Sequence, residues 1–195
     1  MKFVVLLVAS LLFTANLCVA QTPGVGDPIA VANTVIRPGE KLTDIKGATV
    51  SVPSTATGRL KVQHDGQVSG PDRNGCYTTT GEISRVTSKK SGGASAFIVD
   101  TDGESIEIFV QSDGSASQPN TVTVTGGSAT VNVTGDHNNI TVGGAGNNVT
   151  LSGSNNSGMG ATPPPMGPPP SGNVTLGGSG NTWSSNGGNW VIMTD

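Results

Sequence analysis

The stretch Asn120-Thr-Val-Thr-Val-Thr-Gly126 alternates valine with threonine, and variants of it recur every nine residues toward the C-terminus. Alternation with a period of two places valine on one face of a β-strand and threonine on the other. The first inward position is held by Val122, Val131, Ile140, Val149, Val174, Trp183 and Ile192, and the second by Val124, Val133, Val142, Leu151 and Leu176. We therefore predict that residues 119–195 form a β-repeat with a nine-residue period.

Glycine ends each unit and supplies a turn between consecutive strands. One unit cannot bury its apolar face alone, so the units must stack or pair. Two architectures satisfy this requirement. In a narrow β-solenoid, two units form one coil and their inner faces meet. In an antiparallel meander, each turn reverses the chain, and the N-terminal half must cover the apolar face. The solenoid is favoured.

The pattern Asn-Val-Thr-Val-x-Gly-x-x-Asn resembles the short Asn/Gly-rich, nonapeptide-like β-repeats of uncharacterised secreted and cell-surface proteins, chiefly bacterial. The resemblance covers about 119–156 and 173–187 of this chain. It implies an extracellular β-repeat and no established activity.

A proline-rich interruption separates Val149 from the next regular unit at Val174. Its centre is Pro163-Pro-Pro-Met-Gly-Pro-Pro-Pro170, and consecutive prolines cannot donate the hydrogen bonds of a sheet. We predict a loop over about 155–171 that leaves the repeat in register on both sides.

The N-terminus has the pattern of a secretory signal peptide over residues 1–20. Lys2 precedes an apolar run, and Cys18-Val-Ala20 supplies small residues before a cleavage site at Gln21. We expect a secreted, extracellular protein without a membrane span after cleavage, because no later stretch is long and apolar enough.

Between the signal and the repeats, the sequence predicts three segments. Residues 21–34 form a flexible, turn-rich lead-in, residues 35–113 form a small β-rich module, and residues 114–118 form a polar linker. We assign Phe97 and Phe109 to the core of the module. The run from Asp100 to Glu104 is typical of a hairpin turn. The whole chain is therefore predicted to be all-β.

Charge is distributed unevenly along the chain. Of the 10 Lys and Arg residues, one lies in the signal and the other nine lie between Arg37 and Lys90, where Lys89-Lys90 forms a pair rather than a patch. Residues 119–195 hold only two charged side chains, Asp136 and Asp195. This distribution excludes a nucleic-acid partner. Signal removal leaves Cys76 without a second cysteine, so it is a candidate intermolecular thiol.

The sequence presents no catalytic constellation. His64 beside Asp65 suggests an enzyme only weakly, because both occupy a predicted turn. The run Gly143–Asn148 has the nine-residue period of calcium-binding repeats but lacks their acidic ligand. We expect no enzyme activity, no cofactor and no metal site.

Three sets of side chains are candidate sites on the repeat. Sequons for N-glycosylation occur at Asn132, Asn139, Asn148, Asn155 and Asn173. An outward polar ladder is predicted at Thr123, Asn132, Thr141, Thr150 and Thr175. Trp183 and Trp190 are candidate sugar-stacking residues.

The first functional hypothesis is a secreted, non-enzymatic structural protein of a surface, cell wall or matrix, able to self-associate through its end strands. The alternative is an extracellular carbohydrate-binding module whose partner is a polysaccharide.

Overall fold

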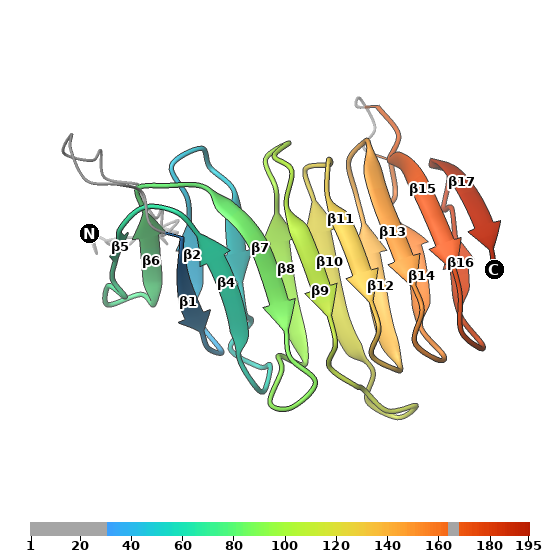
Figure 1. Cartoon of the computed structure of the whole chain (residues 1–195), viewed down its shortest axis with the longest axis horizontal. Coiled ribbons are helices and arrows are strands. Elements are labelled where there is room, and N and C mark those ends of the chain that lie inside the picture. Colours follow the sequence, from blue (N-terminus) through green and yellow to red (C-terminus); the bar gives the residue numbers. More distant parts are fainter. Residues whose placement is uncertain (1–30, 164–167) are drawn as a thin grey trace, which may run out of the picture.

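A computed structural model describes residues 31–163 and 168–195, and over these residues the chain forms strands and turns without a helix. Residues 1–20, predicted to be a signal peptide, and residues 21–30 lie outside the described residues. Two sheets face each other along the length of the molecule (Figure 1). The fold is a β-solenoid of about five turns, which confirms the predicted all-β class and excludes the meander.

The first sheet has eight strands, in the spatial order β1 (Ala32–Ile36), β4 (Leu60–His64), β7 (Ile83–Ser88), β9 (Glu107–Val110), β11 (Thr130–Val133), β13 (Asn147–Leu151), β15 (Ser171–Leu176) and β17 (Asn189–Thr194). The second sheet has nine, in the order β16 (Thr182–Ser184), β14 (Ser157–Gly160), β12 (Asn138–Val142), β10 (Asn120–Thr125), β8 (Ala96–Asp100), β3 (Thr49–Ser51), β2 (Lys41–Thr43), β6 (Cys76–Thr79) and β5 (Val68–Ser69).

Each regular coil consists of two nine-residue units, one in each sheet. Val122 in β10 pairs in parallel with Ile140 in β12, which lies 18 residues further on. Val131 in β11 pairs in the same way with Val149 in β13. The inward side chains of both sheets are buried and meet between them, so period-two strands and a nine-residue period together specify a two-sheet coil.

The N-terminal strands extend the same two sheets with mixed pairing. β1, β4 and β7 are antiparallel, as are β2, β3 and β8, whereas all pairs from β7 and β8 onward are parallel. Both sheets continue directly from the predicted module into the repeats, because β9 pairs with β11 and β8 pairs with β10. β1 also begins at Ala32, within the predicted lead-in.

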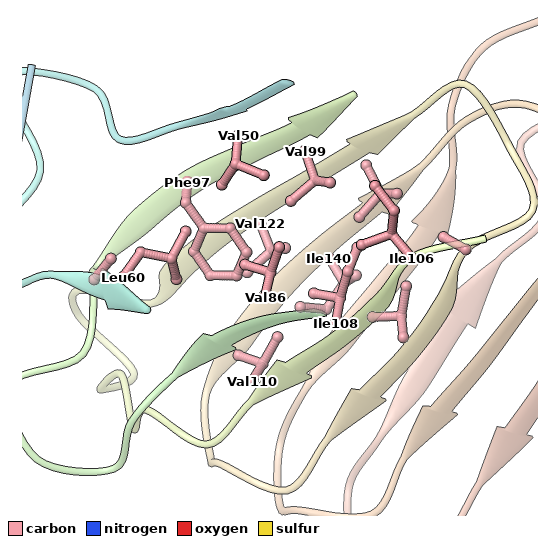
Figure 2. Packing of buried hydrophobic residues seen from close by; sticks show 14 of the residues in the cluster. Val50, Leu60, Val86, Phe97, Val99, Ile106, Ile108, Val110, Val122 and Ile140 are labelled. Carbon is pink, nitrogen blue, oxygen red and sulfur yellow. The ribbon is translucent and has the colours of Figure 1, made fainter. Parts of the chain in front are cut away.

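Most of the largest fully buried side chains come from the N-terminal strands and the first coil. Figure 2 shows Phe97 from β8 and Val86 from β7 pointing toward each other across the space between the sheets. Complete burial of each such aliphatic or aromatic side chain contributes about 1.5–3 kcal/mol. Phe109 is not part of this core, contrary to the sequence prediction. It occupies an outward position of β9 between buried Ile108 and Val110, and Arg85 lies 5.1 Å above its ring.

The turn from Asp100 to Glu104 is not a hairpin. It leads from β8 in the second sheet to β9 in the first, so the two strands do not pair. Asp102 and Gly103 have positive φ angles of 48° and 83°. The Thr101 hydroxyl donates to the carbonyl of Gly127 at 2.6 Å, in the next coil. The turn sequence therefore forms a corner between the two sheets and not a hairpin within one sheet. The reason is that the apolar residues of β8 and β9 face the same core from opposite sides.

The proline-rich loop is shorter than predicted at its N-terminal side. Residues Ser157–Gly160 form β14 and pair in parallel with β12. The sequence analysis missed this strand because glycine replaces the apolar residues at its inward positions, Gly158 and Gly160. Val149 still pairs with Val174, 25 residues further on and thus seven more than in a regular coil. The interruption therefore leaves the coil register intact, as predicted.

Candidate functional site

The polar side chains predicted as one ladder form two ladders on opposite faces. Thr123 and Thr141 are neighbours on the outside of the second sheet. Asn132, Thr150 and Thr175 are neighbours on the outside of the first sheet. The division follows from the coil, since successive nine-residue units alternate between the sheets.

A methionine interrupts the ladder on the second sheet and ends the ladder on the first sheet. On the second sheet Met159 lies between Thr141 and Ser184, and on the first sheet Met193 follows Thr175. Both methionines are exposed. Neighbouring hydroxyls in such a row are about 4.8 Å apart, the spacing of adjacent strands. The rows can donate and accept hydrogen bonds to a neutral hydroxylated ligand, but they provide no acid or base.

The five sequons lie on the repeat surface. Asn139, Asn148 and Asn173 are exposed at outward strand positions, Asn132 is half-buried at another, and Asn155 is exposed in a turn with a positive φ of 56°. The Asn173 side-chain amide donates to Asn148 Oδ1 at 3.0 Å. Sequons on the first sheet therefore share a face with Thr150 and Thr175.

The two tryptophans lie at the end of the core rather than beside the polar rows. Trp183 and Trp190 are half-buried, and their ring centroids are 4.8 Å apart in an edge-to-face arrangement with an interplanar angle of 63°. They fill the space that the missing side chains of Gly158 and Gly160 leave. Both indole N–H groups are buried without a hydrogen-bond partner among the described residues. The rings therefore contribute to packing of the last coils.

The C-terminal end presents two unpaired strand edges in the described chain, those of β16 and β17. On β17, Val191 is 59% exposed, Ile192 44% and Met193 49%. Ile192 follows Val174 in register and points inward, but no further strand among the described residues covers it. This end therefore combines apolar side chains with free backbone donors and acceptors.

A hollow of about 680 Å³ lies in the N-terminal half, around Lys46. The Lys46 ammonium contacts Glu82 at 2.8 Å and Glu104 at 3.3 Å. The hydrogen bonds that the Lys46 ammonium donates to Glu82 and then to Glu104 raise the pKa of Lys46. Burial, and then the negative charge of Asp44, raise the pKa of Glu104. The hollow thus holds one cation between two carboxylates.

His64 and Asp65 line the same hollow but do not form an acid–base pair. The His64 ring is buried, with Nε2 hydrogen-bonded to the Thr34 hydroxyl at 2.9 Å and Nδ1 to the backbone carbonyl of Asp65 at 3.1 Å. The Asp65 carboxylate instead accepts a hydrogen bond from the backbone N–H of Glu82. Both residues therefore stabilise the local turn in this structure.

Cys76 is half-buried in β6, and its sulfur is engaged in a disulfide. The intermolecular partner that the sequence analysis expects for Cys76 stays a prediction. No reactive thiol is placed at this position.

The sequence analysis missed a group of basic side chains on the first sheet. Arg59 directly precedes β4, and Lys61 holds the first outward position within β4. Lys89 directly follows β7, the strand next to β4 in the sheet. These residues are up to 30 positions apart in the chain, and antiparallel pairing of β4 with β7 brings them together. The signal available in the sequence was the alternation of basic with apolar residues from Arg59 to Val62.

The arrangement defines the class of the protein as a two-sheet β-solenoid with polar outer faces. Residues 116–163 match the family described as "Protein of unknown function (DUF3060)". The matched stretch contains β10 to β14, so this chain is similar to that family over its regular coils. No curated protein and no solved structure matches the chain. Over the described residues, no helix is long and apolar enough to cross a membrane.

Proposed function

We propose that this protein is a secreted, non-enzymatic structural component of a cell surface, wall or matrix, and that two copies pair through the C-terminal end of the solenoid. The observation that carries this proposal is the apolar, unpaired edge of β17, with Val191, Ile192 and Met193 exposed. Residues 119–195 contain no lysine or arginine. Edge strands of monomeric proteins commonly carry such charges, which discourage pairing.

A second copy fits this end better than an unrelated partner. Two strand edges, one from each sheet, lie about 10 Å apart, the usual separation of packed sheets. A partner must offer two edges at the same separation, and an identical end does so automatically. A two-fold rotation about an axis normal to the sheets reverses strand direction, so each edge strand pairs with its own copy as an antiparallel strand. With so few charges, the two ends do not repel each other.

The test is sedimentation of the secreted chain, with lysine placed on the edge strand. We expect the unchanged protein to sediment as a dimer and the variant Val191→Lys with Met193→Lys to sediment as a monomer. The matched control is Val35→Lys with Val68→Lys, which adds the same charges to exposed valines on the opposite edge strands, β1 and β5. A monomeric unchanged protein, or equal dissociation of both variants, would refute the pairing.

A carbohydrate-binding module is the second candidate, supported by the regular rows of hydroxyl and amide groups. The test is retention on insoluble polysaccharide, comparing Thr141→Val on the second sheet with Thr150→Val on the first. Each change removes one hydroxyl from one face at nearly constant volume. A truncation before residue 119 is unsuitable, because both sheets continue through that position. Retention that neither change lowers would argue against both ladders as the binding face.

A further inference from the structure

The outer face of β4 and β7 carries a concentration of positive charge. Inward Leu60, Val62 and Val86 are buried, so the alternating residues between them face outward. Lys61 lies opposite Thr87 in the antiparallel register, and Arg59 forms an isolated bridge with Gly93. Pairing of the two strands thus places basic residues from both on one surface.

Two hollows lie side by side on this face, and Lys61 and Lys89 line both. One, of about 300 Å³, is also lined by Asn33, Gln63, Arg85, Thr87 and Gln111. The other, of about 340 Å³, is also lined by Val35, Arg59, Ser91 and Gly92. Neither lining includes an acidic residue. Lys61 and Lys89 therefore lie between the two hollows, and an anionic ligand in either hollow would contact both lysines.

Three of these cations have no carboxylate partner among the described residues. Arg85 is neutralised by Glu107, with Nη2 2.5 Å from its carboxylate, and Lys90 contacts Asp113 at 3.4 Å. No ion pair involves Arg59, Lys61 or Lys89 in the described part of the chain. A local excess of positive charge thus persists on a chain whose formal net charge is −3.

We propose that this face binds an acidic polysaccharide, with Arg59, Lys61 and Lys89 contacting its carboxylate or sulfate groups. The amides of Asn33, Gln63 and Gln111 lie among the cations and can hydrogen-bond sugar hydroxyls. The same outer face continues through β9 and β11 to the row of Asn132, Thr150 and Thr175. An extended, hydroxyl-rich polyanion matches the cations of β4 and β7 and, beyond the outward Glu107 and Phe109 of β9, the neutral polar row. The choice of a polysaccharide rests on the extracellular location in the proposed function.

The test measures binding of the full secreted chain to three soluble polymers: polygalacturonate, dextran sulfate and unmodified dextran. We expect binding to one or both anionic polymers, weakening with salt, and no binding to dextran. Lys61→Gln with Lys89→Gln should weaken anionic binding about tenfold, since it removes two salt-screened ion pairs with the polymer. The matched control is Lys41→Gln with Arg73→Gln, which removes the same charge elsewhere. The polymer that binds identifies carboxylate or sulfate as the recognised group.

Three results would overturn the proposal: no binding to either anionic polymer, equal binding to dextran, or equal weakening by both double variants. The last would indicate attraction by overall charge alone. Sedimentation of the same samples reports pairing through β17, on the opposite end of the molecule (Figure 1). Loss of polymer binding with pairing intact, or the reverse, therefore distinguishes failure of this inference from failure of the proposed assembly.

Discussion

Asn138 donates two hydrogen bonds to one atom of Asn156, the side-chain oxygen Oδ1. The backbone N–H of Asn138 lies 2.8 Å from this oxygen and the side-chain amide nitrogen 3.1 Å from it. Both residues are buried, at the corner where each coil enters the second sheet. The same contact type continues on either side, from Asn120 to Asn138 and from Asn156 to Asn181. The ladder thus satisfies polar groups that the coil corners would otherwise bury unpaired.

We predict that Asn138→Ala lowers the free energy of unfolding by about 1–3 kcal/mol, because it leaves buried partners without hydrogen bonds. Chemical denaturation of the purified chain measures this. The neighbouring change Asn139→Ala is the control, since Asn139 is exposed on the same strand. It should alter stability by no more than about 0.5 kcal/mol. Equal effects at the two positions would show that the ladder contributes no specific stability.

Gly158 and Trp183 form a second structural pair, in which glycine makes room for an aromatic ring. A Cβ added at Gly158 would lie 2.3 Å from the Trp183 ring. We predict that Gly158→Ala destabilises the protein by about 1–3 kcal/mol through overpacking. Gly177→Ala is the matched control, because the nearest atom to its added Cβ is 3.4 Å away.

A smaller side chain at position 183 should relieve the overpacking that Gly158→Ala causes. Combined with Trp183→Leu, the substitution should cost less than the two single changes added together, with a coupling of about 1 kcal/mol in a double-mutant cycle. Strict additivity would mean that the glycine is required for another reason.

Glu104 makes stability depend on pH. Because burial raises the pKa of its carboxyl, the folded state holds the Glu104 proton to a higher pH than the unfolded state. Its favourable contribution is therefore present below the unfolded value of about 4.3 and is lost as pH rises through the raised pKa. We predict that Glu104→Gln is more stable than the unchanged protein at neutral pH and equal to it near pH 3.

Thermal unfolding between these pH values measures the effect. Glu82→Gln serves as the comparison, because Glu82 also contacts Lys46 but its side chain is half exposed. Glu82→Gln should lower the free energy of unfolding by up to about 1 kcal/mol at neutral pH. If Glu104→Gln were instead destabilising at neutral pH, the ion pair with Lys46 would outweigh the cost of burial.

The nine-residue pattern predicted the repeating half well because its signal is local. Val122 and Ile140 are apolar at equivalent positions, and alternation alone determines which side chains face inward. The prediction failed where inward positions are not apolar and where an outward position holds a large apolar residue. Gly158 and Gly160 concealed a strand, because their inward space is filled by rings from later in the chain. Phe109 suggested a core residue by its type, but its position in β9 faces outward under Arg85.

The candidate sites depended more heavily on tertiary structure. The sequence determined that Thr123 and Asn132 point away from the core, since each lies between two apolar positions. It did not determine that they lie on opposite faces, because that follows from two units forming each coil. The basic face could not be predicted either, because pairing of β4 with β7 brings Lys61 and Lys89 together.

The sequence by itself determined a β-repeat with an apolar interior and a nearly uncharged surface over residues 119–195, since alternation and composition act residue by residue. Only the tertiary structure decided which polar rows share a face, which cations remain without partners and which edges stay open. Those properties arise from strand pairing between residues distant in the chain, and the energy of that pairing depends on packing between two sheets rather than on any local pattern.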